Sequence, residues 1–134
     1  MRKLIVAIVI SLTACSMSAD KTVAEQAVTS FHTKLDSGQF DVIYAGSSDD
    51  LKNVTTQGKL VALLEAVHKK LGATKSSKEQ SWNVNFHTSG TFITLIYATT
   101  YEAGDANEQF VYRLQGSNAL LAGYHINADA LILK

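Results

Sequence analysis

The sequence predicts an α+β domain in which N-terminal helices pack on a curled four-stranded antiparallel meander. In the first half of the chain, apolar residues recur with the three- and four-residue spacing of amphipathic helices. From Lys75 onward, apolar and polar residues alternate instead, as they do in half-buried strands. Short polar segments with glycine separate the alternating stretches, which is the pattern of antiparallel hairpins. The length of 134 residues suits one domain.

Residues 1–14 have the composition of a secretory signal peptide. Arg2 and Lys3 form a positive start, an unbroken apolar run covers residues 4–10, and small residues follow it. The run is much shorter than the roughly 20 apolar residues that a membrane-spanning helix needs. We therefore expect export of the chain and cleavage after Ala14.

The only cysteine, Cys15, follows Leu12, Thr13 and Ala14 directly. These four residues resemble the lipobox of bacterial lipoproteins, in which the thiol takes diacylglycerol and the cysteine becomes the first mature residue. The resemblance implies fatty chains such as palmitate on Cys15, and therefore anchoring in a bacterial cell envelope. Ser16, which is not Asp, implies the outer membrane, facing the periplasm. The alternative is an ordinary secreted protein whose cleavage motif merely contains a cysteine, or a buried free thiol.

Residues 15–21 are predicted to be the lipidated cysteine and a short polar tether, and residues 22–134 a single domain. Thr22 and Glu25 form a capping box, which predicts a first helix over 22–37 that stops at Gly38. A short helical segment follows at 39–45, and turn-forming residues interrupt the chain at 46–50. Thr55 or Thr56 is expected to cap the next helix, which ends at Gly72. The expected buried stripes are Ala24, Ala27, Val28, Phe31 and Leu35; Phe40, Ile43 and Tyr44; and Leu60, Leu63, Leu64, Val67 and Leu71.

Four strands are predicted over 80–88, 91–101, 109–115 and 120–127, with turns at 89–90, 104–105 and 116–118. Residues 130–133 are expected to extend the last strand or to pack beneath it. In the first strand, Trp82, Val84 and Phe86 share a face. The second strand carries apolar residues on both faces, so we expect helices to cover one face. Sheet curvature around a pocket, or a partner protein, would cover the other.

Three short motifs carry a family resemblance. Residues 90–101 (GTFITLIYATTY), 123–126 (GYHI) and 69–72 (KKLG) resemble segments of small bacterial exported domains of unknown function. The resemblance covers roughly residues 22–128 and implies a cystatin-like, nuclear-transport-factor-like fold. It implies architecture and an exported location rather than a reaction, because a fold alone does not supply a function.

Charge and motifs exclude several classes of function. Without Arg2 and Lys3 the balance is 10 basic to 12 acidic residues, which argues against a nucleic-acid-binding protein. The histidines lack metal-ligand spacing, and the chain has neither a phosphate-binding glycine loop nor a nucleophile elbow. We therefore expect no metal and no cofactor.

Folds of this plan also house isomerases and dehydratases, which use a carboxylate or histidine base with a tyrosine or aspartate donor. His125 is the main candidate, because it lies mid-strand on the face of Val111 and Arg113. If it points inward near Tyr97 or Tyr101, it could transfer protons. The other residues of suitable type are His32, His68 and His87, with Asp41, Tyr112 and Tyr124. His32 and His68 are expected on helix surfaces, His87 in solvent, and Asp49 and Asp50 in a solvated turn.

The leading hypothesis is a non-enzymatic envelope lipoprotein. Its curled sheet, lined by Tyr97, Tyr101, Tyr112 and Arg113, would bind a partner protein or a small apolar ligand. The alternative is an isomerase- or dehydratase-like enzyme with a small apolar pocket that uses His125. A third possibility is a homodimer formed through the exposed sheet face.

Overall fold

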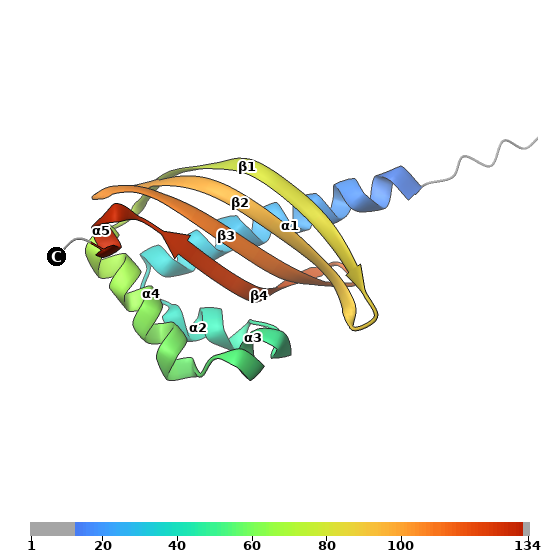
Figure 1. Ribbon diagram of the computed structural model, residues 1–134, viewed down its shortest axis with the longest axis horizontal. Coiled ribbons are helices and arrows are strands. Elements are labelled where there is room, and N and C mark those ends of the chain that lie inside the picture. Colours follow the sequence, from blue (N-terminus) through green and yellow to red (C-terminus); the bar gives the residue numbers. More distant parts are fainter. Residues whose placement is uncertain (1–12, 133–134) are drawn as a thin grey trace, which may run out of the picture.

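The chain forms the predicted α+β architecture, with helices packed against an open four-stranded antiparallel sheet (Figure 1). The computed structural model describes residues 13–132, so the predicted leader up to Leu12 lies outside the described residues. Among residues 13–132, no helix combines the length and the apolar character that a membrane crossing requires. The helices are α1 (Thr13–Asp36), α2 (Phe40–Ala45), α3 (Asp49–Val54), α4 (Gln57–Leu71) and α5 (Asp129–Ile132), and the strands are β1 (Thr74–His87), β2 (Gly90–Tyr101), β3 (Gly104–Gln115) and β4 (Asn118–Asn127).

The strands pair in sequence order, β1-β2-β3-β4, and each hairpin turns on two residues. The turn predicted at Gly104-Asp105 lies instead at 102–103, and Gly104 opens β3. Both β1 and β3 begin earlier than the predicted Gln80 and Gln109. These extra segments are mostly polar, so hydrophobic alternation does not reveal them, although their backbones pair with β2.

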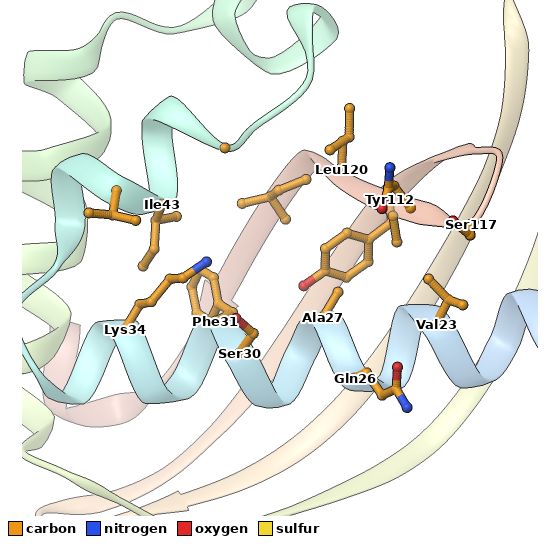
Figure 2. Close-up of a pocket in the computed structure, with 15 residues that line it drawn as sticks. Val23, Gln26, Ala27, Ser30, Phe31, Lys34, Ile43, Tyr112, Ser117 and Leu120 are labelled. Atoms are coloured by element: carbon orange, nitrogen blue, oxygen red, sulfur yellow. The ribbon is translucent and has the colours of Figure 1, made fainter.

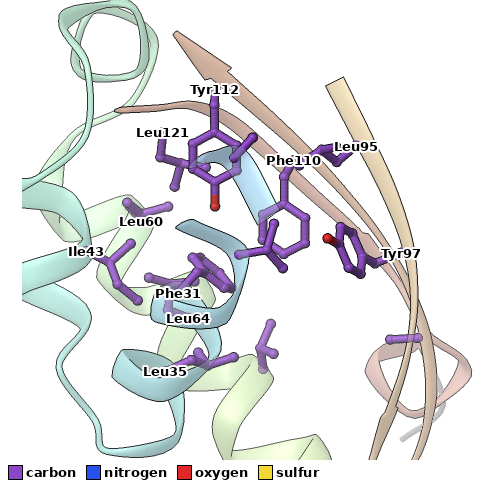
Figure 3. Close-up of a cluster of buried hydrophobic side chains, with 14 of the residues drawn as sticks. Phe31, Leu35, Ile43, Leu60, Leu64, Leu95, Tyr97, Phe110, Tyr112 and Leu121 are labelled. Carbon is purple, nitrogen blue, oxygen red and sulfur yellow. The ribbon is translucent and has the colours of Figure 1, made fainter. Parts of the chain in front are cut away.

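The helices cover the concave face of the sheet, and the core lies between the two layers (Figure 3). Phe31 and Leu35 of α1 and Leu64 of α4 meet Leu95 and Phe110 of the sheet there, and all five are buried. Every residue of this core lies between Ala24 and Ala128. The chain from Ser16 onward therefore retains every core residue that the structure describes.

Helix α1 begins earlier than the predicted first helix. It runs without interruption from Thr13, so the predicted tether over residues 15–21 is helical and the capping box at Thr22 and Glu25 does not begin the helix. Residues 16–21 contain neither glycine nor proline, so nothing in them stops a helix. The predicted stop is confirmed, because Gly38 has a left-handed φ of 73°.

The next helices follow the prediction with three exceptions. Thr56 caps α4 by accepting the Lys59 amide at 3.3 Å, and Gly72 ends that helix. Leu63 is 40% exposed, at the edge of the predicted α4 stripe. Residues 49–54, placed partly in the predicted break, form α3. Of the two arrangements expected for the last segment, extension of β4 is not seen; the segment forms the single-turn helix α5, which packs against α4 and β3.

The convex face of β2 is open rather than covered. Ala98 is exposed, and Phe92 and Ile96 are only half-buried, whereas Ile93 and Leu95 on the concave face are fully buried. No second layer of the described chain covers this face, and a partner protein on it stays a prediction. Neighbouring side chains shield this face in part: the Arg113 guanidinium lies 4.6 Å from the centre of the Phe92 ring. Aromatic and β-branched residues suit a pleated surface without a second layer.

Candidate functional site

The three tyrosines predicted to line a binding face are parts of the core. Tyr97, Tyr101 and Tyr112 project from the concave face and are buried beneath the helices. Phe110 packs edge-on to Tyr97 and stacks with Tyr112. The predicted open face of tyrosines is therefore corrected: α1 fills the hollow, and of the three only Tyr112 lines a cavity described below.

Arg113 lies on the convex face and is fully engaged. Its Nε and Nη2 donate to the two carboxylate oxygens of Asp50 at 2.7 and 2.8 Å, and its Nη1 donates to the Ser89 carbonyl at 2.7 Å. The prediction of a solvated turn at Asp49-Asp50 is therefore wrong for Asp50, which ties α3 to β3. The hydrogen bonds from Arg113 lower the pKa of Asp50 from 3.8 to about 2. Arg113 is committed to this ion pair rather than left free for a ligand.

His125 does not lie in a closed pocket. His125 on β4 pairs with Gln109 on β3 and shares a face with Val111 and Arg113, as predicted. That face is the convex one, and His125 is exposed on it. Tyr97 and Tyr101 project from the opposite face. The proton-transfer hypothesis required an inward His125 beside one of these tyrosines, and the structure does not bring them together.

A buried carboxylate that the sequence analysis missed lies at the centre of the molecule. Glu108 on β3 is 1% exposed. Its Oε1 lies 2.8 Å from His32 Nε2 on α1, and its Oε2 accepts the Tyr101 hydroxyl of β2 at 2.8 Å and the Tyr124 hydroxyl of β4. We call these four residues the carboxylate cluster. It joins one helix to three neighbouring strands.

The carboxylate cluster holds Glu108 in its ionised form. Burial alone raises the pKa of Glu108, but the hydrogen bond and charge of His32, with hydrogen bonds from Thr99 and Tyr124, outweigh burial and lower it below the ordinary value. Burial and the neighbouring carboxylate raise the pKa of Tyr101 and Tyr124, so both remain donors. The interpretation of His32 as a helix-surface residue is wrong, because the ring is buried among Phe31, Tyr101 and Phe110.

The carboxylate cluster is built for structure rather than catalysis. The Glu108 side chain is shielded from solvent, and both of its oxygens already accept hydrogen bonds from protein groups. A catalytic base must reach a proton of its substrate, and these oxygens are enclosed. We therefore assign the cluster to holding α1 on the sheet.

The two depressed carboxyl pKa values predict acid destabilisation. A group whose pKa is lower in the folded chain stabilises the fold above its unfolded pKa, and this stability is lost as the pH falls through the folded value. Asp50 loses its stabilising effect as the pH falls from 3.8 to about 2. The pKa of Glu108 is also lowered, so Glu108 likewise stabilises the fold less as the pH falls. We expect the urea midpoint to fall as the pH drops below about 4. Asp50→Asn should flatten part of this fall.

Asn53→Ala, a neutral change on the same helix α3, serves as the control for this measurement. Its midpoint should follow the pH profile of the natural chain. An Asp50→Asn profile parallel to that of the natural chain would show that the Arg113 pair does not contribute.

A cavity of about 370 Å³ opens between α1, α2 and the β3–β4 hairpin (Figure 2). The Tyr112 ring reaches into this space from β3, and its hydroxyl points toward α1. That hydroxyl is buried and has no hydrogen-bond partner among the described residues. Burial raises the pKa of Tyr112 far above its ordinary value, so the phenol keeps its proton and can donate. We call this space the Tyr112 cavity.

Apolar and polar side chains both line the Tyr112 cavity. Its lining includes Val23, Ala27, Phe31, Val42, Ile43, Ala119, Leu120 and Leu121, with Gln26, Ser30, Lys34, Ser117 and Asn118. Figure 2 shows the Lys34 side chain extending from α1 toward the cavity. Among the described residues, no carboxylate lies within ion-pair distance of Lys34. The cavity thus combines an apolar surface with one buried donor and one cation.

No protein-family model and no curated protein matches the chain. Within the part of the chain that the structure describes, no three His, Cys, Asp or Glu side chains gather in a way that could hold a metal ion. The geometry of the Tyr112 cavity is therefore the basis for assigning a function.

Proposed function

We propose that this chain is a lipid-anchored lipoprotein of the bacterial envelope whose domain binds a small amphipathic ligand in the Tyr112 cavity. The lipobox-like residues ending at Cys15 support the anchor, and the family resemblance supports an exported domain. The observation that carries the binding function is the Tyr112 hydroxyl. Tyr112 is 2% exposed, and its hydroxyl has no hydrogen-bond partner within the described chain.

An unpartnered buried hydroxyl is unusual and needs an explanation. Most buried polar groups are hydrogen-bonded, and leaving one unpaired costs about 1–3 kcal/mol. Because the hydroxyl is enclosed in the free chain, a ligand reaches it only when the lining shifts, and its hydrogen-bond acceptor then removes that cost. The donor is then satisfied only in the complex, and it contributes to affinity.

The lining indicates the chemistry of the ligand. A volume of about 370 Å³ lies at the lower end of the range for small-molecule sites, about 300–1,000 Å³. Phe31, Ile43 and Leu120 suit an apolar body, and the Lys34 ammonium suits a carboxylate, sulfonate or phosphate head. We therefore propose a short apolar molecule with one anionic group.

Tyr112→Phe is expected to stabilise the free domain while weakening binding. Removing the unpaired hydroxyl should raise the free energy of unfolding by about 1 kcal/mol, and loss of its hydrogen bond should weaken affinity about 2- to 10-fold. The probe is 8-anilinonaphthalene-1-sulfonate, an apolar ring system with an anionic group, followed by fluorescence and displaced by decanoate. Urea unfolding measures the stability of the same samples.

Two lysine variants complete the test. Lys34→Gln should weaken probe binding by about as much as Tyr112→Phe, because a charged partner is lost. Lys59→Gln, on α4 and outside the cavity lining, should leave binding unchanged. If Tyr112→Phe binds the probe as tightly as the natural chain and unfolds at the same urea concentration, the cavity is not the binding site.

A further inference from the structure

We propose that the β1–β2 hairpin rests on the surface of the membrane that anchors the chain, with Trp82 and Phe86 in the lipid interface. The occupant of this surface is a phospholipid bilayer. This inference rests on the proposed lipid anchor, and it extends that anchor to a second, non-covalent contact. We call residues 81–95 the aromatic hairpin.

The aromatic hairpin exposes large apolar side chains on the concave face, whereas apolar side chains elsewhere on this face are buried. Phe86 is 72% exposed and Trp82 is 39% exposed, although they lie opposite Thr91 and Leu95 on the face that the helices cover elsewhere. Helix α1 reaches only the inner part of this region, where Lys21 lies 5.5 Å from the centre of the Trp82 ring. Beyond that point, nothing in the described chain covers Phe86.

The composition of this region fits a lipid interface. Residues 81–101 contain no Asp, Glu, Lys or Arg, so no formal charge has to leave water when the hairpin approaches lipid. Asn83 and Asn85 alternate with the aromatics and supply uncharged polar groups. Tryptophan and other aromatic residues concentrate at the headgroup level of membranes, where one side of the ring meets lipid and the other meets water.

The position of the anchor brings the aromatic hairpin toward the bilayer. The N-terminal end of α1 and the tip of the β1–β2 hairpin lie at the same end of the molecule (Figure 1). Lys21 Nζ forms an ion pair with Glu79 Oε1 at 3.2 Å, which places that turn of α1 over β1. From there the helix rises about 9 Å to Cys15, and β1 extends about 13 Å from Trp82 to Phe86. Both segments point toward the same end of the molecule, so an anchor at the start of α1 and the hairpin tip can meet one bilayer surface.

Trp82 is the only tryptophan, so its fluorescence reports this contact directly. The natural, acylated chain is reconstituted into vesicles of phosphatidylethanolamine and phosphatidylglycerol, with and without bromine on the acyl chains. We expect brominated lipid to quench Trp82 emission. Residues 16–134, which retain the whole core, are titrated with the same vesicles without an anchor, and a weak blue shift of the emission is expected.

The matched variants separate this contact from the anchor. Phe86→Ala should reduce vesicle binding of the 16–134 chain about tenfold, because one large apolar side chain no longer enters the interface. Val54→Ala removes an even more exposed apolar side chain, at the C-terminal end of α3, and should leave binding unchanged. Both positions are exposed, so urea midpoints should stay within error of the natural chain.

Three outcomes would overturn the proposal. Trp82 of the acylated chain could show the same emission over brominated and ordinary lipid, or Phe86→Ala could bind as the natural chain does. The 16–134 chain could also show the emission shift without vesicles while light scattering reports a dimer, and the hairpin would then serve a second copy. Failure of the lipid anchor alone would instead leave the 16–134 titration intact.

Discussion

Glu108→Ala is expected to lower the free energy of unfolding by about 3–5 kcal/mol, because each buried donor left without an acceptor costs about 1–3 kcal/mol. The change removes the acceptor for His32, Tyr101 and Tyr124 at once, and all three lie at or near the core. The global stability of a domain of this size is about 5–15 kcal/mol, so the variant should be marginal at 37 °C. Urea unfolding followed by circular dichroism measures the loss.

Two comparisons show whether the loss arises from orphaned donors. Glu65→Ala removes an exposed carboxylate from α4 and should change stability by no more than about 0.5 kcal/mol. A combined variant with Glu108→Leu, His32→Leu, Tyr101→Phe and Tyr124→Phe leaves neither acceptor nor donors, so it should recover much of the lost stability. If Glu108→Ala costs less than about 1 kcal/mol, the cluster does not hold α1 on the sheet.

The fold followed from the period of the hydrophobic pattern, because that period reports which face of each element is buried. The stripe ending at Leu71 and the alternation around Phe110 were sufficient to place helices on a meander, and the structure has this arrangement. The sequence did not predict the start of α1, because the small and polar residues 16–21 are typical of a linker. These residues nevertheless form part of the helix. Polarity predicts exposure better than it predicts the absence of secondary structure.

The carboxylate cluster was missed although part of its signal was present in the sequence. Glu108 has the same strand parity as Phe110 and Tyr112, which places it on the concave face once β3 is extended toward its start. His32 lies four residues after Val28 and three before Leu35, on the buried stripe of α1. What no local pattern reveals is the pairing itself, because 76 residues separate His32 from Glu108.

The Tyr112 cavity depends on tertiary packing in the same way. A tyrosine on the concave face is predictable from alternation, but whether its hydroxyl finds a partner depends on how closely α1 approaches β3. The Asp50 and Arg113 pair joins residues 63 positions apart, so a charge pattern along α3 gives no hint of it. Sequence periodicity thus predicted the layers but not the polar contacts between them.

Cys15→Ala is expected to abolish acylation and processing of the chain. Without the thiol no diacylglycerol can be attached, so labelling with radioactive palmitate should disappear and mass spectrometry should find the precursor with residues 1–14 retained. Each methylene of an acyl chain adds about 0.8 kcal/mol of membrane affinity, so two or three chains make release negligible. The natural protein should therefore need detergent for extraction, whereas residues 16–134 should not.

Ser16→Ala is the matched control, because it alters the neighbouring residue and keeps the thiol. It should be labelled, cleaved and extracted like the natural protein. All core residues lie between Ala24 and Ala128, so neither substitution should shift the urea midpoint of the domain, and any change in location then reports the anchor alone. A natural chain that carries no palmitate, or whose mature form begins at a residue other than Cys15, would contradict the anchor while leaving the Tyr112 cavity to be judged by its own binding data.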